Sequence, residues 1–399
     1  MLQISERGQS MPQSPIRKLV PYAEEAKRKG IKVIHLNIGQ PDIPTAPLAI
    51  EAMHKVMLKV VEYSHSAGNE TYRKKLVSFY RKWNIDVSYN DILVTTGGSE
   101  AIRFAYMSCF DVGDEIIIPE PFYANYNSFA AEAGIKIIPI TSTIKNGFAL
   151  PPIGDFEKHI TPRTRGIMLS NPNNPTGYLY SISELEQLRD IVKKHNLYLI
   201  SDEVYRIFCY DGNPFMSAML LKGIENNVIL IDSISKIFSS CGIRIGTLIT
   251  KNKEVLQTAM KFAMARLSPP SFGQIAGEAI LDTPDEYYRE EYNSYLQRRN
   301  YVIDALNKIQ GVYCPMPKGA FYAIARLPVD DADVFAKWLL SDFKYNNQTV
   351  MLAPASGFYA TPGLGKNEVR IAYVINVDDL KNAVKCIEEA LKVYPGRIK

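Results

Sequence analysis

Three side chains that could do chemistry follow apolar runs of this chain. Lys236 and Asp202 come shortly after the runs 227–232 and 197–201, and Asn174 lies in the loop SNPNNPTG. Asn174 and Asp202 are 28 residues apart, and Asp202 and Lys236 are 34 apart. One strand–helix–strand unit takes about 30 residues. We therefore expect an amide, a carboxylate and an amine at the same edge of neighbouring strands, where open α/β sheets bind their ligands.

A fourth feature could bind an anion. Residues 96–101, TGGSEA, place two glycines and a hydroxyl where a strand would pass into a helix. Free backbone N–H groups at a helix N-terminus attract anions such as phosphate. The alternative is an ordinary strand-to-helix turn, since short glycine motifs also occur without a ligand.

The other side chains have structural alternatives as well. Asp202 could pair with a neighbouring arginine, because a buried carboxylate needs a partner. Lys236 could extend its amine to solvent, or it could be a desolvated amine with a lowered pKa that forms a Schiff base. One ligand requires the whole set. Pyridoxal phosphate (PLP) needs a lysine for its aldehyde, an aspartate for its ring nitrogen, and a helix N-terminus with an arginine for its phosphate.

The elements that would hold these residues are short apolar runs without polar alternation, which are typical of strands buried on both faces. They are 91–95, 115–118, 135–140, 166–169, 197–201, 227–232 and 246–250. Between two of them, residues 181–195 predict a helix, with Ser181 and Glu184 as a capping box and an apolar stripe of Leu185, Leu188, Ile191 and Val192. This repetition predicts a parallel α/β sheet.

The two ends of the chain depart from this pattern. We expect a helix over 14–29 and a strand over 31–38, followed by the proline-rich NIGQPDIPTAP. A polar helix is expected after about residue 285, and shorter α+β elements follow it. We therefore predict a large α/β domain of residues 47–285 and a smaller α+β domain built from residues 1–46 and 286–399.

Composition excludes several function classes. The 399 residues carry 46 Lys and Arg against 42 Asp and Glu, without a basic run, so neither nucleic acid nor a membrane surface is expected as a partner. Five scattered cysteines and five histidines have no metal-ligand spacing, so no disulfide framework and no metal site are expected. The N-terminus has no signal-peptide core, and no run reaches the roughly 18 apolar residues of a membrane span. We expect a cytoplasmic protein.

The motifs SNPNNPTG, SDEVY and SISKIFSSCGIRIG, in this order, resemble those of PLP-dependent aminotransferases of fold type I, class I and II. This group includes aspartate, aromatic and alanine aminotransferases. The resemblance runs from NIGQPDIPTAP to VRIAYV. It implies a large domain with a mostly parallel seven-stranded sheet between helices, a smaller α+β domain from both chain ends, and a homodimer with shared active sites.

The resemblance also implies which residues hold the cofactor. Lys236 looks like the Schiff-base lysine, Asp202 like the partner of the ring nitrogen, and Asn174 and Tyr205 like the partners of the ring hydroxyl. Tyr123, in PEPFYANY, matches the aromatic side chain that stacks on the ring. The remaining matches concern the phosphate: Gly98, Ser99, Ser233 and Arg244 would hold it, and Tyr63, in VEYSHSAG, would reach the phosphate of the neighbouring subunit.

Substrate-binding residues follow in the same way. Arg370, in EVRIAYV, resembles the arginine that binds the substrate α-carboxylate with both arms of its guanidinium, Gly39, in NIGQPD, resembles a glycine beside that carboxylate, and Asn174 would lie beside the substrate as well. The implied activity is ping-pong transfer of an amino group between an L-amino acid and a 2-oxo acid, with Lys236 as general base and acid.

The preferred amino acid stays open at this point. Bacterial aspartate aminotransferases of the similar type often have a lysine where this chain has Ser99, so an aromatic, alanine or broad specificity is an alternative to aspartate. Candidate partners for a second substrate carboxylate are Arg17, Lys18 and Arg103. A C–S lyase or a cyclopropane-forming synthase would share every cofactor residue. A PLP-binding transcription regulator would need a DNA-binding module, and residues 1–46 contain no helix-turn-helix pattern.

Overall fold

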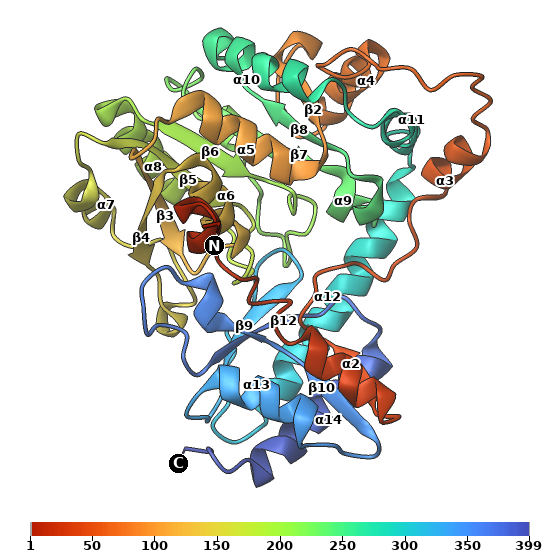
Figure 1. Ribbon diagram of the computed structural model, residues 1–399, viewed down its shortest axis with the longest axis vertical. Helices are drawn as coiled ribbons and strands as arrows, with labels where there is room; N and C mark the ends of the chain where they lie inside the picture. Colours follow the sequence, from red (N-terminus) through yellow and green to blue (C-terminus); the bar gives the residue numbers. More distant parts are fainter. Residues whose placement is uncertain (1, 399) are drawn as a thin grey trace.

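A seven-stranded sheet forms the centre of the fold in the computed structural model, which describes residues 2–398 (Figure 1). Its strand order is β2-β8-β7-β6-β5-β3-β4, and β8 runs antiparallel to both of its neighbours while the other pairs are parallel. The strands are β2 (Ile92–Thr95), β3 (Glu115–Glu120), β4 (Lys136–Thr141), β5 (Thr164–Ser170), β6 (Tyr198–Asp202), β7 (Val228–Ser233) and β8 (Gly246–Ile249). Each coincides with one of the predicted apolar runs, so the predicted mostly parallel sheet is confirmed.

Helices cover both faces of this sheet, because its strands are apolar on both sides. Ile116 and Ile118 pack with residues of α5, α6 and α10, whereas Ile117 packs on the opposite face with residues of α4, α8 and α11. The helices of this part are α3 (Pro47–His54), α4 (Glu70–Arg81), α5 (Gly97–Cys109), α6 (Asn125–Ala133), α7 (Ile153–His159), α8 (Ile182–His195), α9 (Ile234–Ile237), α10 (Lys253–Arg266) and α11 (Ser271–Ile280).

The two ends of the chain pack together beside the central sheet, where red and blue segments meet in the lower part of Figure 1. β1 (Lys32–His35) pairs in parallel with β10 (Gln348–Met351), and β11 (Ala353–Pro354), β12 (Glu368–Ala372) and β9 (Tyr322–Arg326) form an antiparallel sheet. The helices here are α2 (Val20–Arg28), α12 (Asp285–Asn307), α13 (Ala332–Ser341) and α14 (Val377–Val393), whereas α1 (Glu6–Ser10) contacts α6 beside the central sheet. The domain boundaries at residues 47 and 285 stay a prediction.

Two local predictions at the N-terminal end are wrong in extent. The helix expected over 14–29 begins at Val20, because residues 15–19 form a turn that buries Pro15 against Gly357. The strand expected over 31–38 ends at His35. Beyond it, the Gly39 backbone oxygen accepts from Lys236 Nζ. By contrast, α8 begins at the predicted capping box, with Ser181 accepting the backbone N–H of Glu184.

No helix in the described part of the chain is long and apolar enough to cross a membrane.

Candidate active site

A cavity of about 750 Å³ lies where the central sheet faces the sheet of β9 and β12. Its lining includes every candidate for the cofactor and the α-carboxylate except Tyr63: Gly39, Gly98, Ser99, Tyr123, Asn174, Asp202, Tyr205, Ser233, Lys236, Arg244 and Arg370. Asn174, Asp202 and Lys236 follow or end β5, β6 and β7, which are neighbours in the sheet. The predicted meeting of these three residues at one sheet edge is therefore confirmed.

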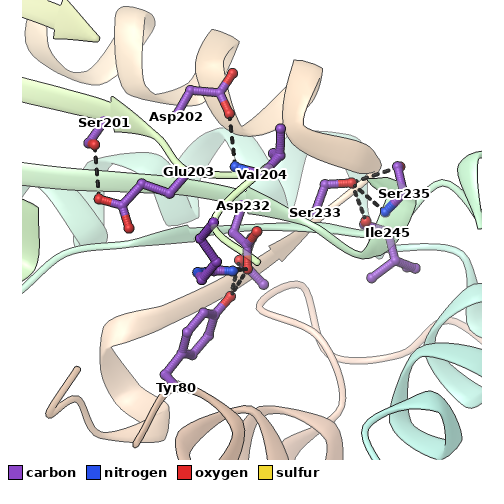
Figure 2. Close-up of polar contacts among 11 residues, drawn as sticks. Tyr80, Ser201, Asp202, Glu203, Val204, Asp232, Ser233, Ser235 and Ile245 are labelled. Atoms are coloured by element: carbon purple, nitrogen blue, oxygen red, sulfur yellow. Dashed lines mark hydrogen bonds and ion pairs between the residues drawn. The ribbon is translucent and has the colours of Figure 1, made fainter. Parts of the chain in front are cut away.

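Asp202 is a buried carboxylate with neutral partners. The Tyr126 hydroxyl donates to Oδ2 at 2.8 Å, and the Val204 N–H donates to Oδ1 at 3.4 Å. Burial is the main reason that the pKa of Asp202 rises to about 6. The carboxylate that pairs with an arginine is Asp232 on the neighbouring strand, whose Oδ2 accepts from Arg206 at 2.9 Å and from Tyr80 (Figure 2). A cationic ring nitrogen is the kind of partner that would suit Asp202.

Lys236 turns its amine inward instead of toward solvent. Its Nζ donates to the backbone oxygen of Gly39 at 2.9 Å and lies 3.6 Å from the Cys241 sulfur. Burial by itself favours the neutral amine, but the nearby ionisable groups of Tyr322, Cys241 and Tyr123 outweigh it and raise the pKa of Lys236. The expectation of a lowered pKa is therefore wrong, because these groups stabilise the ammonium form.

The anion-binding turn predicted at residues 96–101 lies at the N-terminus of α5, and we call it the anion seat. A Cβ on Gly97 would lie 2.4 Å from a guanidinium nitrogen of Arg244, and Gly97 has a φ of +75°, so this turn needs glycine. Arg244 NH1 donates to the Cys241 backbone oxygen at 3.0 Å, which holds the side chain across the turn. The hydroxyls of Ser233 and Ser235 lie 2.7 Å apart on the same wall of the cavity (Figure 2). Ser235 was not identified from the sequence.

Arg370 is fully buried between two aromatic rings. Its guanidinium carbon lies 4.6 Å from the ring centre of Tyr322 and 4.8 Å from that of Phe358. NH1 donates to Asn174 Oδ1 at 3.0 Å and NH2 donates to the Asn37 backbone oxygen, while Nε has no partner among the described residues. Burial lowers the pKa of Arg370 from its usual value. The hydrogen-bond partners of this cation are neutral, so a substrate carboxylate would be its anionic partner.

Tyr322 is a site residue that sequence reasoning missed. Its hydroxyl lies 3.1 Å from the Tyr205 hydroxyl, and a Cβ on Gly39 would lie 1.7 Å from its oxygen. Burial is the main reason that the pKa of Tyr205 is well above its usual value. Tyr322 reaches the cavity because β9 pairs with β12, which puts it diagonally beside Arg370 on the same face. No sequence signal predicts that pairing.

Two further tyrosines lie near Asp202, one lining the cavity and one buried behind it. Tyr123 lines the cavity, and its hydroxyl accepts a hydrogen bond from Asn125 Nδ2 at 2.9 Å. Tyr126, the hydrogen-bond partner of Asp202, packs edge-on against Tyr123 with ring centres 5.5 Å apart. Tyr126 lies in the same PEPFYANY segment as Tyr123, but its contact with Asp202 depends on how α6 packs against β6.

Tyr63 does not join the cavity of its own chain. It lies in the segment between α3 and α4 and is 78% exposed.

Among residues 2–398, no group of three or more His, Cys, Asp or Glu side chains could hold a metal ion.

The three candidates for a distal carboxylate partner lie in different surroundings. Arg17 and Arg103 line the cavity, whereas Lys18 pairs with Asp333 outside it. Arg103 NH2 donates to Glu132 at 2.8 Å, so its charge is neutralised.

Taken together, these groups fit pyridoxal phosphate. The α5 N-terminus, two serine hydroxyls and Arg244 form an anion seat, Asp202 is a buried carboxylate without a basic partner, and Lys236 has its amine inside the same cavity. Gly97 lets the Arg244 guanidinium approach this turn, where a side chain would clash with it.

This chain is similar in sequence and in structure to known aminotransferases. Residues 31–387 match the family model described as aminotransferase class I and II. An aspartate aminotransferase of Rhizobium meliloti is 31% identical over 97% of this chain and 96% of its own length. The structure of aspartate aminotransferase from Thermus thermophilus with maleate superposes with a TM-score of 0.89 at 26% identity, over 98% of this chain and 100% of that one. Alanine aminotransferase from Pyrococcus furiosus gives 0.89 at 31% identity, with the same coverage.

Proposed function

This chain belongs to the class I and II aminotransferases and is a PLP-dependent enzyme, and we propose that it transfers the amino group of an acidic L-amino acid, such as aspartate, to a 2-oxo acid. The observation that carries the transamination is the buried Arg370 beside Asn174, in one cavity with Lys236 and Asp202. The relatives named above support aspartate, and maleate, which was present with the Thermus enzyme, is a four-carbon dicarboxylate like aspartate.

The proposed mechanism assigns each step to a side chain. When bound, PLP supplies an electron sink for the negative charge that develops at the α-carbon of the amino acid. We assign Asp202 to hold the proton on the ring nitrogen, and Asn174 and Tyr205 to donate to the ring hydroxyl. Lys236 would take the proton from the substrate α-carbon and return it two atoms further along, to the carbon on the other side of the amino nitrogen, as general base and then general acid.

Phosphate and ring contacts complete the cofactor site in this proposal. Gly98, Ser99, Ser233 and Arg244 bind the phosphate, and Tyr123 stacks on the ring. Arg370 binds the α-carboxylate with its two-nitrogen fork, and Gly39 lies beside that carboxylate. The rings of Tyr322 and Phe358 keep water from the guanidinium, which strengthens its pairing with a substrate anion.

We also propose a homodimer in which Tyr63 reaches the partner's phosphate site. The support is a run of exposed apolar side chains around it: Met57 is 93% exposed, and Leu58, Val60 and Val61 are exposed as well. Contiguous exposed apolar surface of this kind marks interfaces. Light scattering coupled to size-exclusion chromatography should give twice the mass of the 44.9 kDa chain. The double variant Met57→Asp, Val60→Asp should have the mass of one chain.

A cytoplasmic location is proposed from the five free cysteines, since a reducing compartment keeps thiols unpaired.

Absorbance spectroscopy tests the activity. The cofactor band of the purified enzyme should change on addition of aspartate or glutamate and return on addition of a 2-oxo acid. Lys236→Ala should lose the band of the parent protein and its reversible change. If alanine or tyrosine reacts faster than aspartate, the acidic specificity is wrong and the alternative favoured by the Pyrococcus alanine aminotransferase replaces it. Release of ammonia without a reversible change would instead indicate elimination chemistry.

A further inference from the structure

We propose that Arg17 binds the side-chain carboxylate of the substrate and thereby sets the preference for acidic amino acids. This inference rests on the proposed transamination. It concerns how the cavity distinguishes aspartate or glutamate from neutral amino acids, for which neither the α-carboxylate site nor the cofactor site provides a means.

The cations that line the cavity have different partners. They are Arg17, Arg103, Lys236, Arg244 and Arg370. Arg370 and Arg244 face the α-carboxylate and phosphate positions, and Lys236 donates to Gly39. Arg103 is paired with Glu132 and also lies over the Phe129 ring at 5.2 Å. Arg17 alone among these described cations has no side-chain hydrogen bond or salt bridge. It is the cation that can take a second carboxylate without breaking an existing pair.

The backbone around Arg17 is tightly held, which suits a binding residue. Pro15 is buried, and a Cβ on Gly357 would lie 2.2 Å from its ring. On the other side, Lys18 pairs with Asp333 at the start of α13. The Arg17 side chain itself is exposed, and its neighbours on both sides hold its backbone in place.

Arg17 is also linked to the α-carboxylate site through a single residue. Asn37 Nδ2 donates to the Ile16 backbone oxygen at 3.2 Å, and the Asn37 backbone oxygen accepts from Arg370 NH2. Asn37 therefore ties the backbone next to Arg17 to the Arg370 side chain. Two arginines held in this way can bind the two ends of one dicarboxylate.

The course of the N-terminal segment explains how Arg17 reaches the cavity. The dark red segment starts beside the central sheet, where α1 contacts α6, and then descends to α2 in the small sheet region (Figure 1). On this path Met11, Pro12, Ser14 and Ile16 also line the cavity. The segment covers the cavity, and Arg17 is the charged side chain that it contributes.

The test compares Arg17→Gln with Lys18→Gln, a neighbour that loses the same charge outside the cavity. For each variant, the ratio of kcat/KM for aspartate to that for alanine is measured. Charged hydrogen bonds contribute enough for the ratio to fall about 10- to 100-fold in Arg17→Gln. Lys18→Gln should keep the ratio of the parent protein, and Arg17→Lys should recover part of it.

A binding measurement gives a second readout that does not depend on turnover. The Kd of maleate, titrated into the PLP-loaded enzyme, should rise at least about tenfold in Arg17→Gln and stay unchanged in Lys18→Gln. Arg103→Gln is the competing variant. If Arg103→Gln lowers the aspartate-to-alanine ratio and Arg17→Gln does not, the assignment to Arg17 is overturned.

The outcomes separate this inference from the proposed function. If the parent protein transaminates aspartate but Arg17→Gln keeps its ratio and its maleate Kd, Arg17 has no role in specificity. If the parent protein transaminates only neutral donors, no acidic preference exists to explain, and the inference fails while transamination stands. If no amino acid changes the cofactor band reversibly, the proposed transamination itself is wrong.

Discussion

The hydroxyl oxygens of Tyr205 and Tyr322 lie 3.1 Å apart, although the residues are separated by 117 positions in the chain. Tyr205 comes from the loop after β6 and Tyr322 from β9, so this pair joins the central sheet to the small sheet at the cavity. The Tyr322 ring also packs on Arg370 and occupies the space that Gly39 leaves open. Tyr322 thus contacts both Tyr205, which we propose binds the cofactor, and Arg370, which we propose binds the substrate.

We expect Tyr322→Phe to weaken catalysis modestly, because it removes the hydroxyl partner of Tyr205 and keeps the ring on Arg370. Loss of one buried neutral hydrogen bond corresponds to a fall of about 2- to 10-fold in kcat/KM for the amino acid. Steady-state kinetics measures this. Tyr313→Phe is the control, since Tyr313 is exposed on the surface. Equal kinetics for Tyr322→Phe and the parent protein would show that the hydroxyl pair has no catalytic effect.

Arg370→Ala should reduce kcat/KM for every amino acid, since each one has an α-carboxylate. Truncating one partner of a buried charged pair costs about 2–5 kcal/mol, or roughly 30- to 4000-fold. Arg370→Lys should also be impaired, because an ammonium group cannot reproduce the two-nitrogen fork. The cofactor band should remain in both variants. Arg326→Lys on the same small sheet, where the side chain lies over Tyr313, should behave as the parent protein.

Arg206→Met should destabilise the fold by about 3–5 kcal/mol, because it leaves the buried Asp232 carboxylate without its cation. Asp232 Oδ1 has no partner within residues 2–398, so few groups compensate. Urea unfolding at constant pH measures the change. Arg189→Met breaks only surface pairs with Asp190 and Glu186 and should leave the midpoint unchanged. Addition of Asp232→Asn to Arg206→Met should recover stability; a further loss would contradict this account.

Glu291→Gln should stabilise the protein increasingly as the pH rises. Glu291 is buried on α12, where Ser239 and Tyr287 hydroxyls donate to Oε1, and burial raises its pKa from 4.5 to about 8. The folded state holds this proton more tightly than the unfolded state does. The stability that comes from the protonated form is therefore full below about pH 4.5 and is lost as the pH rises through about 8.

The measurement is the free energy of unfolding of Glu291→Gln and of the parent protein at pH 5, 7 and 9. Their difference should grow with pH by at most about 1.4 kcal/mol per unit and level off above the raised pKa. Glu290→Gln on the same helix is exposed and should give no pH-dependent difference. A constant difference for Glu291→Gln would mean that Glu291 does not retain its proton in the folded state.

Much of the fold followed from the sequence because its signals are local. Buried parallel strands are continuous apolar runs, so all seven strands of the central sheet were predicted within a few residues. Regular spacing then placed Asn174, Asp202 and Lys236 at neighbouring strand ends. The helix expected from residue 14 failed at its start, since the packing of Pro15 on Gly357 involves a distant segment that local periodicity does not contain.

Tertiary structure decided which distant side chains complete the site. Tyr322 and Tyr126 enter it through the pairing of β9 with β12 and the packing of α6 on the central sheet, and neither depends on a nearby motif. The sequence did not distinguish Arg17, Lys18 and Arg103 as candidates. In the structure, Lys18 lies outside the cavity, Arg103 is paired with Glu132, and Arg17 lines the cavity. Motifs and periodicity therefore determined the chemistry at the strand ends. The surroundings of each charge depend on contacts between remote segments, and these exist only once the chain has folded.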